Sequence, residues 1–156
     1  MKSILGIGNA LTDILSFLPD DELLLRFHLP KGSMQHVDQT TGDKIWKILK
    51  PMGIQYVAGG SAANTISGAA IFGMEAGFIG KVGDDELGSL FKADIEQNGV
   101  KSTLLKGKAS SGRAMVFITD PNAERTFAVY LGAAFELVPD DLKPEYFDGY
   151  EYFHIE

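Results

Sequence analysis

The feature that most constrains this chain is an alternation of apolar runs and helix-like stretches between residues 54 and 105. The apolar runs are short and compact, as buried strands are, and they occupy residues 54–58, 76–82 and 100–105. The stretches between them, 62–72 and 84–98, space their apolar residues at helical intervals and end at glycine. Strands that alternate with helices predict a parallel sheet covered by helices, joined by right-handed crossovers.

The rest of the chain adds shorter elements to this α/β plan. We expect a strand at residues 3–8, a turn at 13–19, an excursion with a strand or two at 20–35 and a helix at 38–49. Further along we expect antiparallel strands at 113–119 and 125–131, a short helix at 139–147 and a strand at 150–155. A chain of 156 residues is long enough for one hydrophobic core, so we expect one domain.

Gly59 and Gly60 stand between the strand at 54–58 and the next helix, for which Ser61 is the expected N-cap. The free backbone N–H groups and the positive dipole end of such a helix suit oxygen-rich ligands. Asn64, in the first turn, adds an amide that both donates and accepts, which suits a hydroxyl group. The same residues also suit an ordinary turn from strand to helix, and both interpretations stay open at this point.

Polar side chains follow the first strand, at the end where α/β sheets gather their ligands. Asn9 is one of them. A carboxylate at Asp13 can accept hydrogen bonds from two vicinal hydroxyls of a sugar, but it is equally suited to capping a turn. Gly6 and Gly8 begin a dinucleotide-binding fingerprint in which Leu11 replaces the third glycine, and no helix clearly follows, so we reject that motif.

Composition and charge exclude several classes of function. The formal charge is −7 and Lys and Arg form no cluster, which argues against a nucleic-acid partner. Residues 1–18 are too short and too polar for a signal or membrane segment, so we expect a cytoplasmic protein without a membrane partner. The absence of cysteine fits a reducing compartment. The three histidines have no metal-ligand spacing, and we predict no metal site.

Several charged and apolar residues have simple structural interpretations. Asp84 and Asp85 are better placed to cap a helix than to act in catalysis. Arg113 and Arg125 each begin a strand, where a solvated side chain is favoured over a ligand contact. The last predicted strand presents apolar side chains that need a partner: Tyr152, Phe153 and Ile155.

Two segments together carry a family resemblance. The motifs Gly-Gly-Ser-Ala-Ala-Asn-Thr at 59–65 and Gly-Lys-Val-Gly-Asp-Asp-Glu-Leu-Gly at 80–88 resemble the first signature of the ribokinase-like (PfkB) family of carbohydrate and nucleoside kinases. Gly8 and Asn9, followed by Asp13, are similar to the first substrate loop of this family, in the spacing of its adenosine-kinase branch. The resemblance covers nearly the whole chain, and residues 20–50 are its least specific part.

The resemblance implies a fold, an activity and a substrate site. The fold is a ribokinase-like α/β parallel (Rossmann-like) sheet with helices plus a small β-sheet lid, of which residues 1–156 are the N-terminal portion of a single domain. Lid segments are expected at roughly 20–36, 54–58 and 113–130. The activity is ATP-dependent phosphoryl transfer to a sugar hydroxyl of an adenosine-, ribose- or fructose-like acceptor. The acceptor-binding residues are Asp13, Gly59, Gly60 and Asn64, with Asn9 and Ser61 as second choices.

The family places its phosphate cradle and catalytic base in a Gly-Ala-Gly-Asp motif, and that tetrapeptide does not occur here. We therefore expect a chain truncated before the C-terminal half, with no catalytic residue of its own and no turnover of ATP. ATP and Mg²⁺ are implied for the full-length kinase, and neither is expected to bind this chain well. Expected partners are the small-molecule sugar or nucleoside, and either the missing half or a second copy joined through the lid.

Two other classes of function remain as alternatives. One is a binding module that holds a nucleoside or sugar without chemistry. The other, which rests only on Gly6 and Gly8, is half of a Rossmann-type oxidoreductase.

Overall fold

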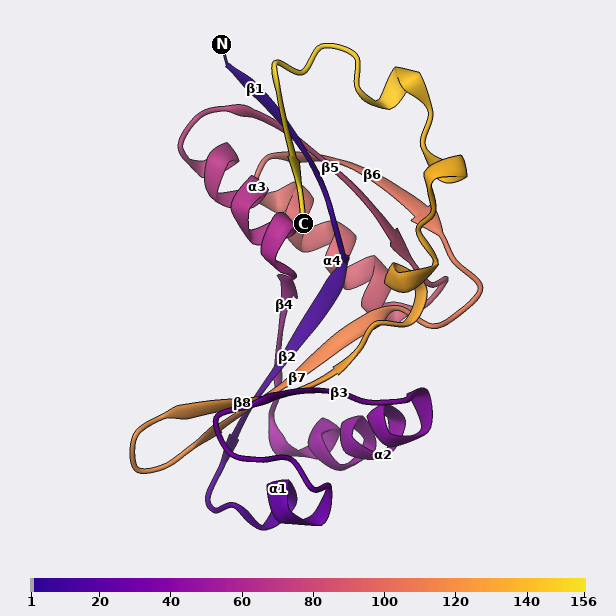
Figure 1. Cartoon of the computed structure of the whole chain (residues 1–156). Coiled ribbons are helices and arrows are strands. Elements are labelled where there is room, and N and C mark those ends of the chain that lie inside the picture. Colours follow the sequence, from indigo (N-terminus) through magenta and orange to yellow (C-terminus); the bar gives the residue numbers. More distant parts are fainter. Residues whose placement is uncertain (1) are drawn as a thin grey trace. The chain divides into compact units, whose positions relative to one another are not determined.

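Strands from distant parts of the chain form two separate sheets in the computed structural model, which describes residues 2–156 (Figure 1). The first compact unit comprises the chain up to Thr12 together with residues 57–112 and 131–156. The second unit comprises residues 13–56 and 113–130. None of the helices found in residues 2–156 has the length and apolar character needed to cross a lipid bilayer.

The first unit contains a four-stranded sheet in the order β6-β5-β1-β9, and all three strand pairs are parallel. Its strands are β1 (Ser3–Ile7), β5 (Glu75–Val82), β6 (Val100–Lys106) and β9 (Tyr152–Ile155), and its helices are α3 (Ser61–Ile71) and α4 (Glu86–Gln97). One core cluster joins Ile66 of α3, Phe91 of α4 and Phe78 of β5, so both helices cover the same face of the sheet. The predicted parallel sheet with covering helices is confirmed.

The other face of this sheet is covered without any long helix. Leu5, Ile7 and Ile79 pack there against Leu142 and Phe147, which lie in the segment between β8 and β9. This segment contains three short 3₁₀ helices at Gly132–Glu136, Pro139–Asp141 and Pro144–Tyr146. Both faces of β1 and β5 are therefore buried, which explains their nearly continuous apolar sequences.

The second unit is built on a five-stranded sheet in the order β3-β8-β7-β2-β4. Its strands are β2 (Leu11–Leu18), β3 (Met34–His36), β4 (Gln55–Gly59), β7 (Gly112–Thr119) and β8 (Glu124–Tyr130). β7 and β8 form the predicted antiparallel pair, and β3 runs parallel to β8. The helices of this unit are α1 (Glu22–Arg26) and α2 (Gln39–Leu49), and a 3₁₀ turn at Lys50–Met52 follows α2.

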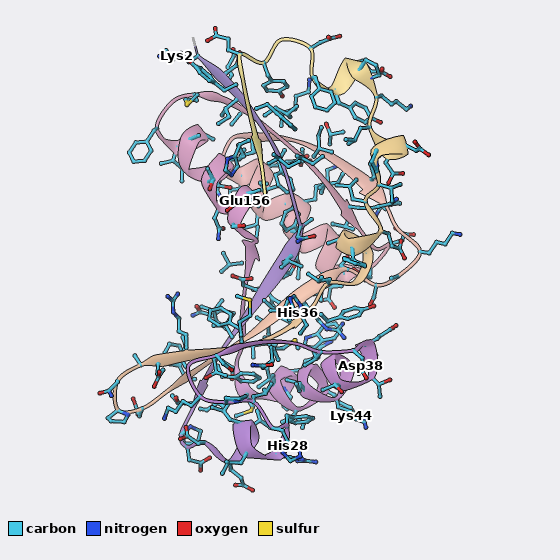
Figure 2. All side chains as sticks on the ribbon, viewed as in Figure 1. Lys2, His28, His36, Asp38, Lys44 and Glu156 are labelled. Atoms are coloured by element: carbon cyan, nitrogen blue, oxygen red, sulfur yellow. The ribbon has the colours of Figure 1, made fainter. Side chains whose placement is uncertain are left out.

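Helix α2 begins where the sequence predicts. Asp38, labelled in Figure 2, is its N-cap. The Asp38 carboxylate accepts a hydrogen bond of 2.7 Å from the backbone N–H of Thr41. The same hydrogen bond lowers the pKa of Asp38 below its usual value. Ile45 and Leu49 are fully buried, whereas Lys44 lies on the exposed side. The buried apolar side of α2 packs against the core of the unit, as expected for an amphipathic helix.

Two expectations for the second unit are wrong. Residues 13–18 belong to strand β2 and not to a turn. Ile14, Ser16 and Leu18 are buried while Phe17 is exposed, which is the alternation of a strand with one buried face. The polar residues Asp13 and Ser16 obscure this alternation in the sequence. The alternation over residues 54–105 assigned the strand at 54–58 to the parallel sheet of β5, whereas β4 joins the five-stranded sheet of β7 and β8, the strands with which the family resemblance had grouped it. Its burial alternates along the strand, as in a sheet with one open face, whereas β5 is buried almost throughout.

The helix expected at residues 139–147 is also wrong, because two short 3₁₀ helices occupy this range. Pro144 explains the interruption. Lys143, which precedes it, has φ −110° and ψ 141°, the extended conformation that a following proline favours. A continuous α-helix cannot pass through that conformation.

Candidate functional site

The turn between β4 and α3 is shaped by Gly60. This residue has φ 94° and ψ 137°, a conformation that side chains with a Cβ rarely adopt. A Cβ at Gly60 would also overlap the backbone carbonyl oxygen of Asn9. Glycine is therefore required at position 60 both by the backbone conformation and by the close approach of the β1–β2 connection.

The start of α3 differs from the prediction in one respect. Gly60, not Ser61, is the N-cap, and within residues 2–156 no side chain caps this helix end. Ser61 is the first helical residue, and its carbonyl accepts a hydrogen bond of 2.9 Å from the hydroxyl of Thr65. Ser61 and Asn64 are both exposed. The N–H groups of the first turn are thus left to solvent or a ligand.

Five of the six predicted site residues, Asn9, Gly59, Gly60, Ser61 and Asn64, belong to the first unit. The carbonyl of Asn9 lies against Gly60, so the β1–β2 connection and the start of α3 are neighbours. Asn9 is exposed and Gly59 is buried. This part of the molecule combines backbone N–H groups, a side-chain amide and glycine backbone at one end of the parallel sheet, a set of groups that suits a polyhydroxylated ligand.

Asp13, the sixth predicted residue, belongs to the second unit, where it lies near the start of β2. Burial raises the pKa of its carboxyl group from 3.8 to about 6, and burial is the only cause of the shift. The ionised carboxylate is therefore poorly solvated, and within residues 2–156 no hydrogen-bond donor compensates for its burial. Hydroxyl donors of a ligand would stabilise it, since hydrogen bonds to the charged form favour that form.

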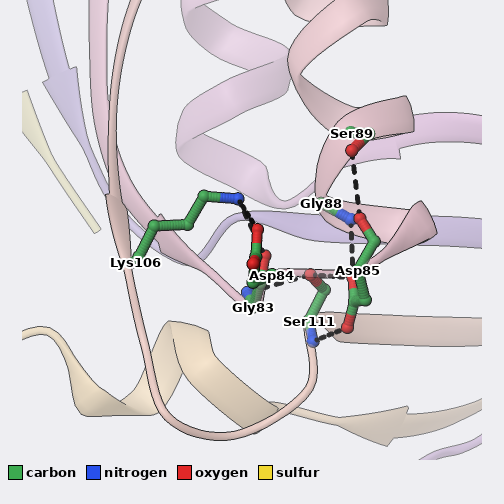
Figure 3. Close-up of polar contacts among 7 residues, drawn as sticks. All are labelled: Gly83, Asp84, Asp85, Gly88, Ser89, Lys106 and Ser111. Atoms are coloured by element: carbon green, nitrogen blue, oxygen red, sulfur yellow. Dashed lines mark hydrogen bonds and ion pairs between the residues drawn. The ribbon is translucent and has the colours of Figure 1, made fainter.

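The Gly-Asp-Asp-Glu-Leu-Gly motif has a structural role, because its side chains form hydrogen bonds with neighbouring segments (Figure 3). The Asp85 carboxylate accepts hydrogen bonds from the N–H of Gly88 at 2.9 Å, from the hydroxyl of Ser111 at 2.6 Å and from the N–H of Ser111 at 2.7 Å. The prediction that Asp85 caps a helix is confirmed. Asp84 is not the cap: it is exposed and forms an ion pair of 3.1 Å with Lys106. The motif joins the start of α4 to the loop that precedes β7.

The prediction of a solvated side chain at Arg113 is wrong. Its side chain is not solvated but only 1% exposed, in the second unit. Its guanidinium forms an ion pair with Asp43 of α2 and lies 5.1 Å from the ring centres of both Trp46 and Tyr130. The partners lie far from Arg113 in sequence, so no local pattern indicates them. Arg125, by contrast, is exposed as predicted.

Within residues 2–156, no group of three His, Asp or Glu side chains is arranged to hold a metal ion. The dinucleotide motif also lacks its structural context, because β1 is followed by strand β2 and not by a helix. The oxidoreductase alternative therefore loses the feature on which it rested.

Comparison with protein families matches residues 37–156 to the pfkB family of carbohydrate kinases. Among curated proteins, an aminoimidazole riboside kinase of Salmonella typhimurium is 35% identical over 100 residues, which are 62% of this chain and 31% of that protein. A probable fructokinase of Arabidopsis thaliana is 30% identical over 99 residues, again 62% of this chain and 30% of the relative.

Solved structures agree with these matches. A probable sugar kinase of Rhizobium etli superposes with a TM-score of 0.83 at 32% identity, over 99% of this chain and 46% of the other. An adenosine kinase of Sinorhizobium meliloti gives a TM-score of 0.82, also at 32% identity, with the same coverage of 99% and 46%. The chain thus spans less than half the length of these two structures, and about a third of the curated relatives that it matches.

Proposed function

Because this chain belongs to the pfkB family of carbohydrate kinases, we propose that it carries the acceptor-binding part of a sugar or nucleoside kinase. The whole kinase would transfer a phosphoryl group from ATP to a hydroxyl of the acceptor. The observation that supports this role best is the environment of Asp13, where burial raises the pKa of the carboxyl group to about 6. Hydroxyl donors of a ligand are suitable partners for such a buried carboxylate.

Each predicted site residue has a definite chemical task in this proposal. The Asp13 carboxylate accepts hydrogen bonds from two vicinal hydroxyls and so orients the sugar ring. Gly59 and Gly60 bring backbone close to the ligand, because neither carries a Cβ. The exposed amide of Asn64 donates to and accepts from a further hydroxyl, and Asn9 and Ser61 contribute polar groups beside it.

The residues of this chain do not fit ATP and Mg²⁺. The Gly-Ala-Gly-Asp motif is absent from the 156 residues, and no carboxylate cluster suited to a metal occurs in the part of the chain that the structure describes. Phosphoryl transfer depends on positioning and on charge stabilisation around the phosphate, and this chain supplies neither. We therefore propose that it binds the acceptor but does not turn over ATP alone.

Titration calorimetry on the purified chain tests the proposal, with ribose, fructose and adenosine as ligands. We expect at least one of them to bind, and Asp13→Asn to weaken that binding by about tenfold or more, since a charged acceptor is lost. The matched control is Asp120→Asn, which changes an exposed aspartate of the same unit. Failure of all three ligands, or equal binding by Asp13→Asn, would refute the proposal.

A parallel ATP hydrolysis assay on the same preparation tests the second part. We expect no ATP turnover above background, with or without the acceptor. Turnover that persists after further purification and responds to Asp13→Asn would show that the chain contains a phosphate site of its own.

A further inference from the structure

The second unit contains a hollow that lies apart from the proposed acceptor site. It forms where the end of β2 meets α1 and the end of α2 (Figure 1), and all of its lining residues belong to this unit. Asp13 precedes Leu18, a lining residue, by five positions along β2, which is about 16 Å in an extended strand. A ligand in the hollow is therefore out of reach of the Asp13 carboxylate.

Apolar side chains from three elements line much of the hollow. They are Leu18 of β2, Leu23 of α1, Ile48 of α2 and Met52 of the following 3₁₀ turn. Leu18 is buried, whereas Met52 is 46% exposed, so this apolar surface is open to solvent. The volume of the hollow is about 210 Å³, below the range of about 300–1,000 Å³ that is usual for drug-sized ligands. The hollow therefore suits a smaller molecule with an apolar group of a few carbon atoms.

Charged side chains of both signs line the same hollow. Asp20 and Glu22 provide carboxylates, and Arg26 provides a guanidinium. None of these three side chains forms an ion pair with another described residue, whereas Asp21, which stands between the two acids, is paired with Lys31 at 2.9 Å. The Asp20 carboxylate accepts a hydrogen bond of 2.9 Å from the backbone N–H of Glu22, which holds it at the start of α1. Charges of both signs are thus available beside the apolar surface.

The separation of Glu22 and Arg26 indicates what kind of ligand the charges suit. Residues four positions apart on a helix are neighbours, and a Glu followed by an Arg at this spacing commonly forms an ion pair. In α1, as the structure describes it, this pair does not form, and the Arg26 guanidinium lies 5.8 Å from the ring centre of Phe27. An anionic and a cationic group that line one hollow without neutralising each other are complementary to a ligand that carries both charges.

We propose that this hollow binds a free α-amino acid with an apolar side chain, such as leucine. The ammonium group of the ligand donates hydrogen bonds to the carboxylates of Asp20 and Glu22. Its carboxylate accepts charge-assisted hydrogen bonds from the guanidinium of Arg26. Its side chain leaves water and packs against the apolar surface that includes Leu18 and Leu23. An apolar amine or an apolar carboxylic acid matches only part of this set, so each is a test of the assignment. The site does not depend on the function proposed above.

The experiment titrates leucine into the isotope-labelled chain and follows the backbone amide resonances by NMR, which gives both the affinity and the place of binding. We expect a dissociation constant of about 1 mM or tighter, with the largest shifts at the residues that line the hollow, Leu23 and Ile48 among them. Leucinamide lacks the carboxylate and N-acetylleucine lacks the ammonium group. Each should bind about tenfold more weakly, because a charge-assisted contact is lost. Glycine, which has no apolar side chain, should cause no measurable shift.

Variants assign the contacts to particular side chains. Arg26→Gln and Glu22→Gln should each weaken leucine by about fivefold to tenfold. Both positions are exposed, so neither variant disturbs the core. Arg125→Gln is the matched control, because Arg125 is also an exposed arginine of the second unit, 5.9 Å from the ring centre of Phe127, but does not line the hollow. It should leave the affinity for leucine unchanged.

Three results would overturn the proposal. One is the absence of shifts around the hollow at leucine concentrations up to about 20 mM, well above the expected dissociation constant. Another is equal binding of leucine by Arg26→Gln and by the unaltered chain. The third is equal binding of leucinamide or N-acetylleucine, which would mean that the hollow takes a simple amine or acid. None of these results affects the acceptor-binding experiment, because Arg26 and Glu22 play no part in the proposed acceptor site.

Discussion

Replacing Gly60 by alanine tests the geometry at the start of α3 directly. The φ of 94° and ψ of 137° would strain an alanine by about 1–3 kcal/mol. The new Cβ would also overlap the carbonyl oxygen of Asn9, a backbone atom that cannot rotate away, which adds about 1–3 kcal/mol. We therefore expect Gly60→Ala to lower the free energy of unfolding by about 2–6 kcal/mol.

Gly73 provides the matched control for this substitution. It follows the same helix and has φ 88°, but a Cβ there would meet no atom within 4 Å. Gly73→Ala should therefore cost only the backbone strain, about 1–2 kcal/mol. The difference between the two variants isolates the contact with Asn9.

The assay is urea unfolding followed by circular dichroism at 222 nm, which reports the helix content of the whole chain. We expect Gly60→Ala to unfold at a clearly lower urea concentration than Gly73→Ala, and to melt several degrees lower, at about 2–4 °C per kcal/mol. If the two variants are equally stable, Asn9 does not lie against Gly60, and the β1–β2 connection does not constrain the start of α3.

Three further predictions concern charged residues. The raised pKa of Asp13 means that the folded chain binds a proton more tightly than the unfolded chain, so stability should fall as pH rises from about 4 to about 6, by on the order of 3 kcal/mol. Urea titrations of Asp13→Asn across that range should lack this fall, and a fall that persists would contradict the assignment. Asp85→Ala should cost about 2–4 kcal/mol, because it removes a helix cap and both bonds to the loop before β7, whereas the control Asp84→Ala should change stability by less than about 1 kcal/mol; equal losses in thermal melts would refute the distinction. Asp43→Ala leaves the buried guanidinium of Arg113 without its ion pair and should cost about 3 kcal/mol or more, which fluorescence of the neighbouring tryptophan can follow during urea unfolding; a loss below about 1 kcal/mol would show that the pair is dispensable.

Most helices and strands follow from local patterns in the sequence. Helix α4 begins at Asp85 and ends before Gly99 because the capping side chain and the glycine act within one turn of the helix. Strands β5 and β6 are predicted correctly for a similar reason, since a compact apolar run between turn residues indicates a buried strand. The hairpin of β7 and β8 is confirmed as well.

Predictions that required more than local pattern were less successful. Asp13 and Ser16 interrupt the apolar alternation of β2, so its strand character is visible only when both faces of the sheet are known. The site residues carried over from the family resemblance remain predictions, and the binding experiments above are their test.

The sequence by itself determined the α/β class, the main helix boundaries and the family, because periodicity, capping and motif spacing are properties of neighbouring residues. Only the tertiary structure decided that Arg113 is buried against Asp43 and that burial raises the pKa of Asp13. Each of these depends on residues far apart in the chain: Arg113 and Asp43 are 70 positions apart. Strand pairing, burial and desolvation arise from such distant neighbours, which no local pattern specifies.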